Sequence, residues 1–223
     1  MEHRRLGRTG LRVSSVGLGT MTWGRDTDEL EAKEQLDIFL DAGGTLVDTA
    51  ASYGEGVSEE VIGTLLREHV DRQDLVLVSK AGVRTWRTGE RPSVADASRG
   101  SLLDTLDTSL ARLGTDHLDL LLVQVPDSST SLEETAHALS LAVSSGRTRY
   151  VGIANHPAWA SVRMHDLLSE CGPGLRHRGL RPPGSGRAHR QVPGDDSTGL
   201  TGRLPAPALL RVPLPGRGAP GCG

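Results

Sequence analysis

The chain has 223 residues, 36% of them hydrophobic and 24% charged, which is enough for one large domain or two small ones with a substantial core. Its two cysteines exclude a disulfide framework, and no apolar N-terminal segment or long apolar run indicates a signal peptide or a membrane span, so we expect a cytoplasmic protein. The formal net charge of −3 argues against nucleic acid or a membrane surface as a partner.

The composition changes sharply after Cys171. All six aromatic residues precede this point, whereas the last 52 residues hold 12 of the 28 glycines and 9 of the 12 prolines. The formal charge is −9 over residues 1–171 and +6 over residues 172–223. We therefore expect one folded domain over 1–171 and a low-complexity, disordered tail over 172–223.

The first predicted element is a small β-hairpin in residues 4–14, where two short extended runs flank a glycine-containing turn. Five apolar strand-like runs follow, separated by longer segments of helical period. These runs are residues 13–20, 45–50, 75–80, 118–125 and 150–155. Such alternation is typical of βα units around a parallel sheet, and both a doubly wound sheet and a (β/α)8 barrel fit it.

Two of the helical segments show a clear apolar face. Their apolar positions recur at steps of three and four residues: Leu103, Leu106, Leu110 and Leu113 in one, and Leu132, Ala136, Leu139 and Val143 in the other. Two pairs have the spacing of a capping box, Asp28 with Glu31 and Ser131 with Glu134. We therefore expect helices to begin directly after Asp28 and Ser131.

The common cofactor, metal and nucleophile motifs are missing from the sequence. Gly17-Leu18-Gly19 is followed by Thr20-Met21-Thr22, so the third glycine of a dinucleotide-binding fingerprint is absent. The eight histidines form no HExxH motif and have no cysteine partner at zinc spacing, so no metal site is expected. There is also no GxSxG elbow and no phosphate-binding GxxxxGK[ST] loop.

Polar residues stand at or just after the carboxyl ends of four predicted strands. These residues are Asp48, Lys80, Gln124 and Asn155. Strands covered on both faces are almost wholly apolar, so polar side chains there need a reason, and in barrels this edge carries the chemistry. Two alternatives stay open, because Asp48 could cap a turn and Lys80 could be a solvated strand end.

A tyrosine follows the first of these residues closely. Tyr53 lies five residues after Asp48 and is one of only two tyrosines. A phenol beside an ammonium–carboxylate pair can donate a proton to a carbonyl oxygen while the carbonyl carbon receives a hydride. The pattern of Asp48, Tyr53 and Lys80 therefore points to carbonyl reduction without a metal or a protein nucleophile.

Five segments in this order and spacing resemble the aldo-keto reductase superfamily. They are GLGTMTWG, DTAASYGEGVSEEVIG, LVSKAG, LDLLLVQVPD and YVGIANH, and the resemblance runs from about Arg4 to Cys171. It implies a (β/α)8 barrel preceded by the hairpin, NADPH as the hydride donor and a small-molecule carbonyl substrate.

The resemblance assigns catalytic roles residue by residue. Asp48, Tyr53 and Lys80 match three of the four catalytic residues of the family, with Tyr53 as the proton donor. The fourth is usually histidine, and this chain has Gln124 there. Glutamine can donate a hydrogen bond to the substrate oxygen but cannot titrate. Two hypotheses follow: a slower reductase, which we favour because Tyr53 remains, and a non-catalytic NADPH-binding protein like the related potassium-channel β subunits.

The resemblance also suggests cofactor and substrate contacts. Thr20, Met21, Asp48 and Asn155 correspond to residues beside the nicotinamide, although Ala154 replaces a serine that accompanies this asparagine in the family. Trp23 and Tyr53 would border the substrate pocket. For Trp23, packing in the core is an equal alternative.

The tail does not continue the barrel pattern. A (β/α)8 domain takes about 250 residues, and five units account for the first 171 here. We expect an incomplete barrel whose open strand edges favour self-association. The tail is either a natural disordered extension or, as we favour, the product of a shifted reading frame, and an inactive fragment of a longer reductase is a further alternative.

Overall fold

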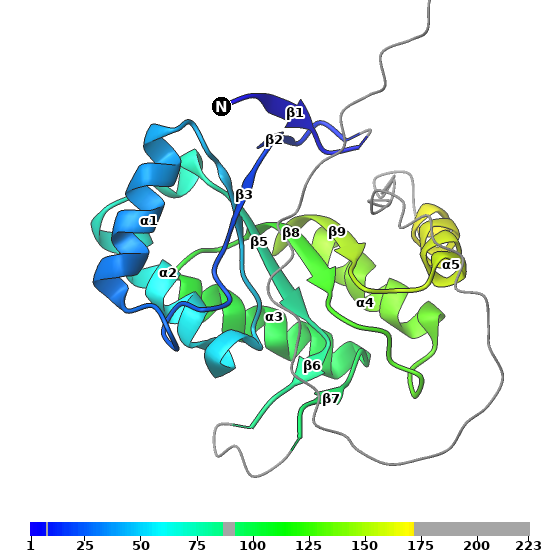
Figure 1. Cartoon of the computed structure of the whole chain (residues 1–223). Coiled ribbons are helices and arrows are strands. Elements are labelled where there is room, and N and C mark those ends of the chain that lie inside the picture. The colour runs from blue at the N-terminus through cyan, green and yellow to red at the C-terminus, as the bar shows by residue number, and fades with distance from the viewer. Residues whose placement is uncertain (8, 87–91, 172–223) are drawn as a thin grey trace, which may run out of the picture.

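The computed structural model describes residues 1–7, 9–86 and 92–171, and its centre is a five-stranded parallel sheet (Figure 1). The strands lie in the order β3 (Gly17–Gly19), β4 (Leu46–Asp48), β5 (Val76–Ala81), β8 (Leu118–Val123) and β9 (Thr148–Ile153). Each strand therefore pairs with the sheet strand that follows it along the chain. All five strands predicted from the apolar runs are confirmed.

Among the described residues, four α-helices connect these strands and a fifth follows β9, and together they cover one face of the sheet. They are α1 (Glu29–Asp41), α2 (Val57–Glu68), α3 (Arg99–Leu113), α4 (Leu132–Ser144) and α5 (Ala158–Glu170). Along that face α3 contacts α2 on one side and α4 on the other (Figure 1). Short 3₁₀ helices, η1 (Tyr53–Gly56) and η2 (Arg72–Asp74), precede α2 and β5.

Two small antiparallel pairs lie outside the main sheet. The predicted hairpin is confirmed as β1 (His3–Arg5) and β2 (Arg12–Ser14), and a second pair is formed by β6 (Val83–Arg84) and β7 (Val94–Ala95). The Ser14 hydroxyl accepts hydrogen bonds from the backbone N–H groups of Thr45 and Leu46. The hairpin therefore lies against the amino end of the sheet, away from the carboxyl edge.

The strands bury both faces, which explains their apolar sequences. The helix-facing core includes Leu77 and Leu121, whereas Val78 and Leu122 point to the opposite face and pack in a smaller cluster with Val13 of the hairpin. Side chains alternate along a strand, so Asp48 shares a face with Leu46 and Lys80 shares a face with Val78. The two polar residues therefore lie on this second face, at the carboxyl ends of their strands.

The apolar faces of α3 and α4 follow the predicted periodicity with one shift. In α3 the buried leucines are Leu102, Leu106, Leu110 and Leu113, so Leu102 takes the place expected of Leu103, which is only partly buried. In α4, Ala136 and Leu139 are buried, while Leu132 and Val143 are partly buried at its two ends.

One predicted capping box forms completely and the other only in part. Asp28 and Glu31 cap α1 reciprocally. At α4 the Ser131 hydroxyl accepts from Glu134 N, but the Glu134 carboxylate accepts from the backbone N–H of Arg99 at 3.0 Å. The reciprocal half of this box was wrongly predicted, because Glu134 instead satisfies a free donor in the first turn of the neighbouring helix α3.

Taken together, the expected tail and the open strand edges are only partly covered by the described residues. The tail predicted over 172–223, with its boundary at Cys171 and its proposed frameshift origin, lies outside the described residues. Within the described ranges, β3 and β9 are the outer strands of the main sheet, and self-association through them stays a prediction. No helix among the described residues has the length and apolarity needed to cross a membrane.

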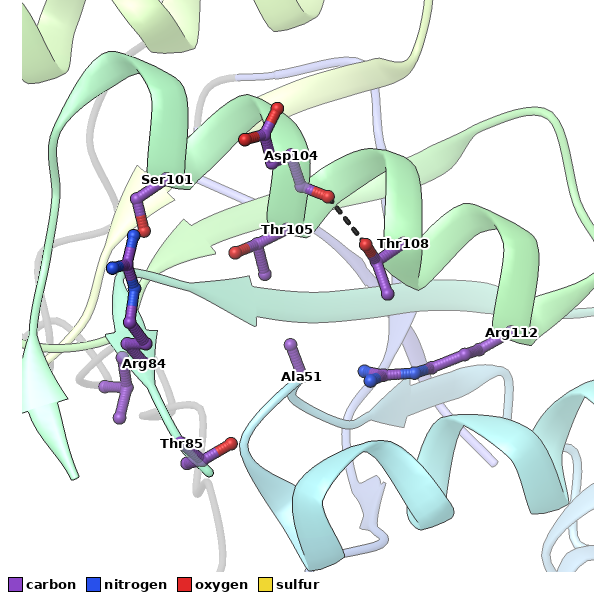
Figure 2. Close-up of a pocket in the computed structure, with 9 residues that line it drawn as sticks. Ala51, Arg84, Thr85, Ser101, Asp104, Thr105, Thr108 and Arg112 are labelled. Carbon is purple, nitrogen blue, oxygen red and sulfur yellow. Dashed lines mark hydrogen bonds between the residues drawn. The ribbon is translucent and has the colours of Figure 1, made fainter. Parts of the chain in front are cut away.

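A buried ion pair joins α2 to α3 behind β5. The Glu59 side chain is fully buried; it accepts from Ser79 Oγ at 2.6 Å and from Arg112 Nη1 at 3.2 Å. Figure 2 shows Arg112 extending from α3 toward Ala51. The helices approach closely here, since a Cβ at Gly63 would lie 2.1 Å from the carbonyl oxygen of Arg112. A buried carboxylate needs such a cation, so this pair fixes α2 relative to α3.

Replacing this cation tests its structural role. We expect Arg112→Met to lower the free energy of unfolding by about 3 kcal/mol, because the Glu59 carboxylate would be buried without a counterion. Adding Glu59→Gln should restore part of the loss, since a neutral amide costs less to bury. Urea denaturation of the full chain measures both effects, with Arg67→Met on the exposed face of α2 as the control. An unchanged midpoint for Arg112→Met would contradict the assignment.

The segment after β8 is held by the Asp127 carboxylate. Its oxygens accept from Ala97 N, Ser129 N and Thr130 Oγ1 at 2.7 to 2.9 Å. Burial acts to raise the pKa of Asp127, but these hydrogen bonds outweigh it and hold that pKa below its ordinary value of 3.8. The ionised carboxylate therefore ties the segment that follows Gln124 to the start of α3.

The lowered pKa of Asp127 makes its contribution depend on pH. The stabilisation is fully present above the unfolded pKa of 3.8 and is lost as the pH falls through the lower folded pKa. We expect Asp127→Asn to cost about 1–2 kcal/mol at neutral pH and progressively less below pH 3.8. Urea unfolding over a pH series tests this, with exposed Asp41→Asn as the control. A cost that does not change with pH would refute the role of the charge.

Candidate functional site

The polar residues singled out in the sequence gather at one edge of the sheet. Asp48 and Lys80 lie at the carboxyl ends of β4 and β5, Gln124 directly follows β8, and Asn155 comes two residues after β9. These strands are parallel neighbours, so their carboxyl ends share an edge. The structure thus brings together side chains from four separate segments.

Lys80 is at the centre of the site. Its side chain is only 9% exposed, and its ammonium donates to Asp48 Oδ2 at 2.6 Å, to the backbone oxygen of Thr49 at 2.9 Å and to the Tyr53 hydroxyl at 3.1 Å. The same Nζ lies 4.7 Å from the centroid of the Tyr53 ring. The ammonium has three hydrogens, so these three acceptors satisfy it completely.

The turn after β4 places Tyr53 over this ammonium. Tyr53 begins η1, its backbone N–H donates to Ala50 O, and the two following residues adopt left-handed conformations, with φ of 55° at Gly54 and 57° at Glu55. Gly56 has φ of 99° and forms the N-cap of α2. The chain therefore reverses sharply after Tyr53, which leaves the half-buried phenol at the edge of the sheet.

A buried hydroxyl network supports this turn from below. Ser58 Oγ lies 2.7 Å from Thr20 Oγ1 and 3.0 Å from Thr49 Oγ1, and it donates to the backbone oxygen of Thr20. Thr20 also donates to the Asp48 carbonyl. All three hydroxyl residues are fully buried. The network joins the ends of β3 and β4 to the start of α2, so it fixes the Thr49 carbonyl that binds Lys80.

Gln124 is held at three of its atoms. Its backbone N–H donates to Ala81 O at 2.8 Å, its backbone oxygen accepts from Asn155 Nδ2 at 2.8 Å, and its side-chain Oε1 accepts from Ser52 Oγ at 2.9 Å. Asn155 has φ of 59°, a left-handed conformation that asparagine tolerates well. The amide of Gln124 is therefore fixed beside the residue that precedes Tyr53.

The residues expected near a cofactor or substrate are placed differently from one another. Thr20 uses its hydroxyl within the buried network, and Met21 is half-buried. Trp23 is fully buried in the main core, where its indole N–H donates to Gln35 Oε1 at 2.9 Å. This placement of Trp23 corresponds to the packing alternative. Asn155 is exposed at the edge of the sheet.

Sequence reasoning missed several residues that support the site. Ser52 binds Gln124, Ser58 supports Thr49, and Glu59 holds Ser79, the residue before Lys80. One signal was available for Glu59, because it stands three residues before Ile62 on the buried face of α2. The partners of Ser52 and Ser58 come from distant segments, and no local pattern identifies them.

A separate cavity of about 250 Å³ lies beside α3 (Figure 2). Its lining includes Arg84, Ser101, Thr105, Thr108 and Arg112, and none of the predicted site residues. Arg84 pairs with Asp96 at 2.9 Å and Arg112 with Glu59, so both cations already have carboxylate partners. No group of three or more potential metal ligands occurs among the described residues.

The chemistry available at the sheet edge is proton donation by a phenol beside a buried cation, with a side-chain amide on a neighbouring segment. The Tyr53 phenol touches a cation that would stabilise the phenolate left after proton transfer. Asp48 balances that cation, and the amide of Gln124 is hydrogen-bonded to Ser52, the residue before Tyr53. This set suits a substrate oxygen that gains negative charge during the reaction.

Comparisons with known proteins identify the family of the chain. A family profile described as "Aldo/keto reductase family" matches residues 15–176. The aldo-keto reductase YhdN of Bacillus subtilis is 35% identical over 160 residues, covering 70% of this chain and 47% of the relative. The L-glyceraldehyde 3-phosphate reductase of Escherichia coli is 37% identical over 175 residues, covering 76% and 50%. The chain thus spans about half the length of these relatives.

A solved structure supports the fold. The holo form of an aldo-keto reductase from Bacillus halodurans superposes with a TM-score of 0.64 at 34% sequence identity, covering 70% of this chain and 50% of that one. This confirms the expected (β/α)8-barrel class, of which the described residues form part. The family profile covers well over half of the sequence, and the chain therefore belongs to the aldo/keto reductase family.

Proposed function

We propose that the protein reduces an aldehyde or ketone to the alcohol with NADPH. The observation that carries the proposal is the position of Lys80, whose ammonium contacts both Asp48 and the Tyr53 hydroxyl. Membership of a family of carbonyl oxidoreductases supports it. The proposal places the protein in the cytoplasm, with a small carbonyl compound as its substrate.

In the proposed reaction, NADPH when bound supplies a hydride to the carbonyl carbon. The Tyr53 hydroxyl transfers its proton to the carbonyl oxygen, so the C=O double bond becomes C–H and O–H. Lys80 stabilises the phenolate that Tyr53 leaves behind, and Asp48 accepts a hydrogen bond from the Lys80 ammonium and so orients it. Gln124 Nε2 donates a hydrogen bond to the same oxygen and moves no proton.

The carboxyl edge has features that fit a flat nicotinamide ring. Gly19 is exposed and lies opposite Asp48 in the register, and a Cβ built on it would meet no atom within 4 Å. Space is therefore open beside the Lys80–Asp48 pair. Asn155 is exposed at the same edge, and its side-chain oxygen can accept from a carboxamide while Nδ2 is bound to Gln124 O.

Removing the phenol hydroxyl tests the proposal. We expect Tyr53→Phe to lower kcat for NADPH-dependent aldehyde reduction by about 10²- to 10⁴-fold, because the proton donor is lost. Binding of NADPH, followed by quenching of protein fluorescence, should remain. The matched control is Tyr150→Phe, which alters the only other tyrosine of the chain.

Two outcomes would count against the proposal. Equal rates for the wild-type protein and Tyr53→Phe would remove Tyr53 as the proton donor. NADPH binding without turnover of any aldehyde would instead favour a non-catalytic cofactor-binding protein. One relative is described as a probable voltage-gated potassium channel subunit beta from Oryza sativa, 34% identical over 175 residues.

Gln124 offers a second test of the same reaction. We expect Gln124→His to raise turnover of a simple aldehyde by about tenfold, equivalent to ~1.4 kcal/mol, because an imidazole can both donate a hydrogen bond and carry charge. Steady-state kinetics with NADPH at several pH values measures the change. An unchanged rate for Gln124→His would show that glutamine at this position does not slow the reduction.

A further inference from the structure

The side-chain amide of Gln124 has one defined neighbour in the site. The Ser52 hydroxyl donates to its Oε1 at 2.9 Å. Among the described residues, nothing accepts a hydrogen bond from its Nε2, whereas the backbone of Gln124 is bound on both sides by Ala81 O and Asn155 Nδ2. Both Ser52 and Gln124 are half-buried, so neither residue is sealed inside the core of the described residues.

We propose that Ser52 is a positioning residue, which turns the Gln124 amide so that its N–H₂ group faces the substrate oxygen. An amide presents a hydrogen-bond acceptor on one side and donors on the other. The donor hydroxyl of Ser52 occupies the acceptor side, and this leaves Nε2 for the substrate. The proposal rests on the proposed carbonyl reduction.

The orientation matters because the two faces of the amide have opposite effects on a carbonyl. With Nε2 forward, the amide stabilises the negative charge that develops on the substrate oxygen. With Oε1 forward, two acceptor oxygens would face each other and the interaction would be repulsive. Histidine can adjust by changing tautomer or charge, whereas glutamine depends on a neighbour to set its direction.

The position of Ser52 in the chain suits this role. It directly precedes Tyr53 and is the N-cap of η1, so the same turn carries the proton donor and the group that orients the second hydrogen-bond donor. The segment containing Gln124 lies two strands away in the sheet and is reached only through folding. Ser52 therefore links the two halves of the proposed oxygen-binding site.

Kinetics of serine variants test the proposal in the full chain. We expect Ser52→Ala to lower kcat for aldehyde reduction about 3- to 10-fold with little change in the KM for NADPH, as for the loss of one hydrogen bond. Ser52→Thr keeps the hydroxyl and should restore most of the rate. Ser101→Ala, at the cavity beside α3, is the control for removing a half-buried serine.

A double variant separates orientation from general damage. If Ser52 acts through Gln124, then Ser52→Ala should cost nothing further in a Gln124→Ala background. Additive losses in the double variant, or no rescue by threonine, would overturn the proposal, because both indicate an effect that does not pass through the amide.

A spectroscopic measurement keeps the inference separable from the proposed function. In ¹⁵N NMR spectra, the side-chain N–H₂ signals of Gln124, identified by their loss in Gln124→Glu, should be well dispersed in the wild type and in Ser52→Thr. They should move toward random-coil values in Ser52→Ala. If the wild-type protein shows no turnover, the proposed reduction is refuted. Dispersed Gln124 signals in that protein would still support the orientation of the amide by Ser52. Signals unchanged in Ser52→Ala would refute the orientation itself.

Discussion

The ammonium of Lys80 is the interaction on which the site depends. A cation with a side chain only 9% exposed is costly unless acceptors surround it, and here they come from a strand end, a backbone carbonyl and a turn. Asp48, Thr49 and Tyr53 must all be in place to satisfy it. The contacts that stabilise the buried ammonium therefore also bring the proposed proton donor, Tyr53, next to this cation.

The rest of the fold holds these acceptors in position from the helix side. Ser58 fixes the end of β4 through Thr20 and Thr49, while Glu59, the next residue of α2, binds Ser79 and the guanidinium of Arg112. Two consecutive residues of α2 thus form hydrogen bonds to neighbouring parts of the sheet, Ser58 beyond the ends of β3 and β4 and Glu59 in β5. The hydroxyl groups and the Glu59 carboxylate of this arrangement are fully buried and hydrogen-bonded, so a small displacement of α2 would leave several of them unsatisfied, which makes the arrangement rigid.

The strands and the edge that carries the candidate site could be predicted from local patterns in the sequence, whereas the strand order followed only from the family resemblance. Apolar runs that end in a polar residue predicted Asp48 and Lys80 at one edge, and topology alone then made them neighbours. The hydrogen-bond partners of individual polar side chains could not be predicted. Glu134 has the spacing of a capping box yet binds Arg99 of another helix, since a free backbone donor there competes for the same carboxylate. The bond from Ser52 to Gln124 joins residues 72 positions apart and has no local signature.

In the proposed reaction, glutamine in place of histidine changes how the substrate oxygen is stabilised at this edge. The hydrogen bond that an imidazole donates varies in strength with the protonation of the ring. The hydrogen bond that a neutral amide donates varies only with the direction of its N–H₂ group. Direction requires a rigid setting, and the chain provides it: backbone hydrogen bonds fix Gln124 between β5 and Asn155, and a hydroxyl holds its Oε1. The proposed hydrogen bond from the Gln124 amide to the substrate oxygen depends on the direction of the amide and not on its protonation. Its strength should therefore change little with pH but should fall when the Ser52 hydroxyl is removed.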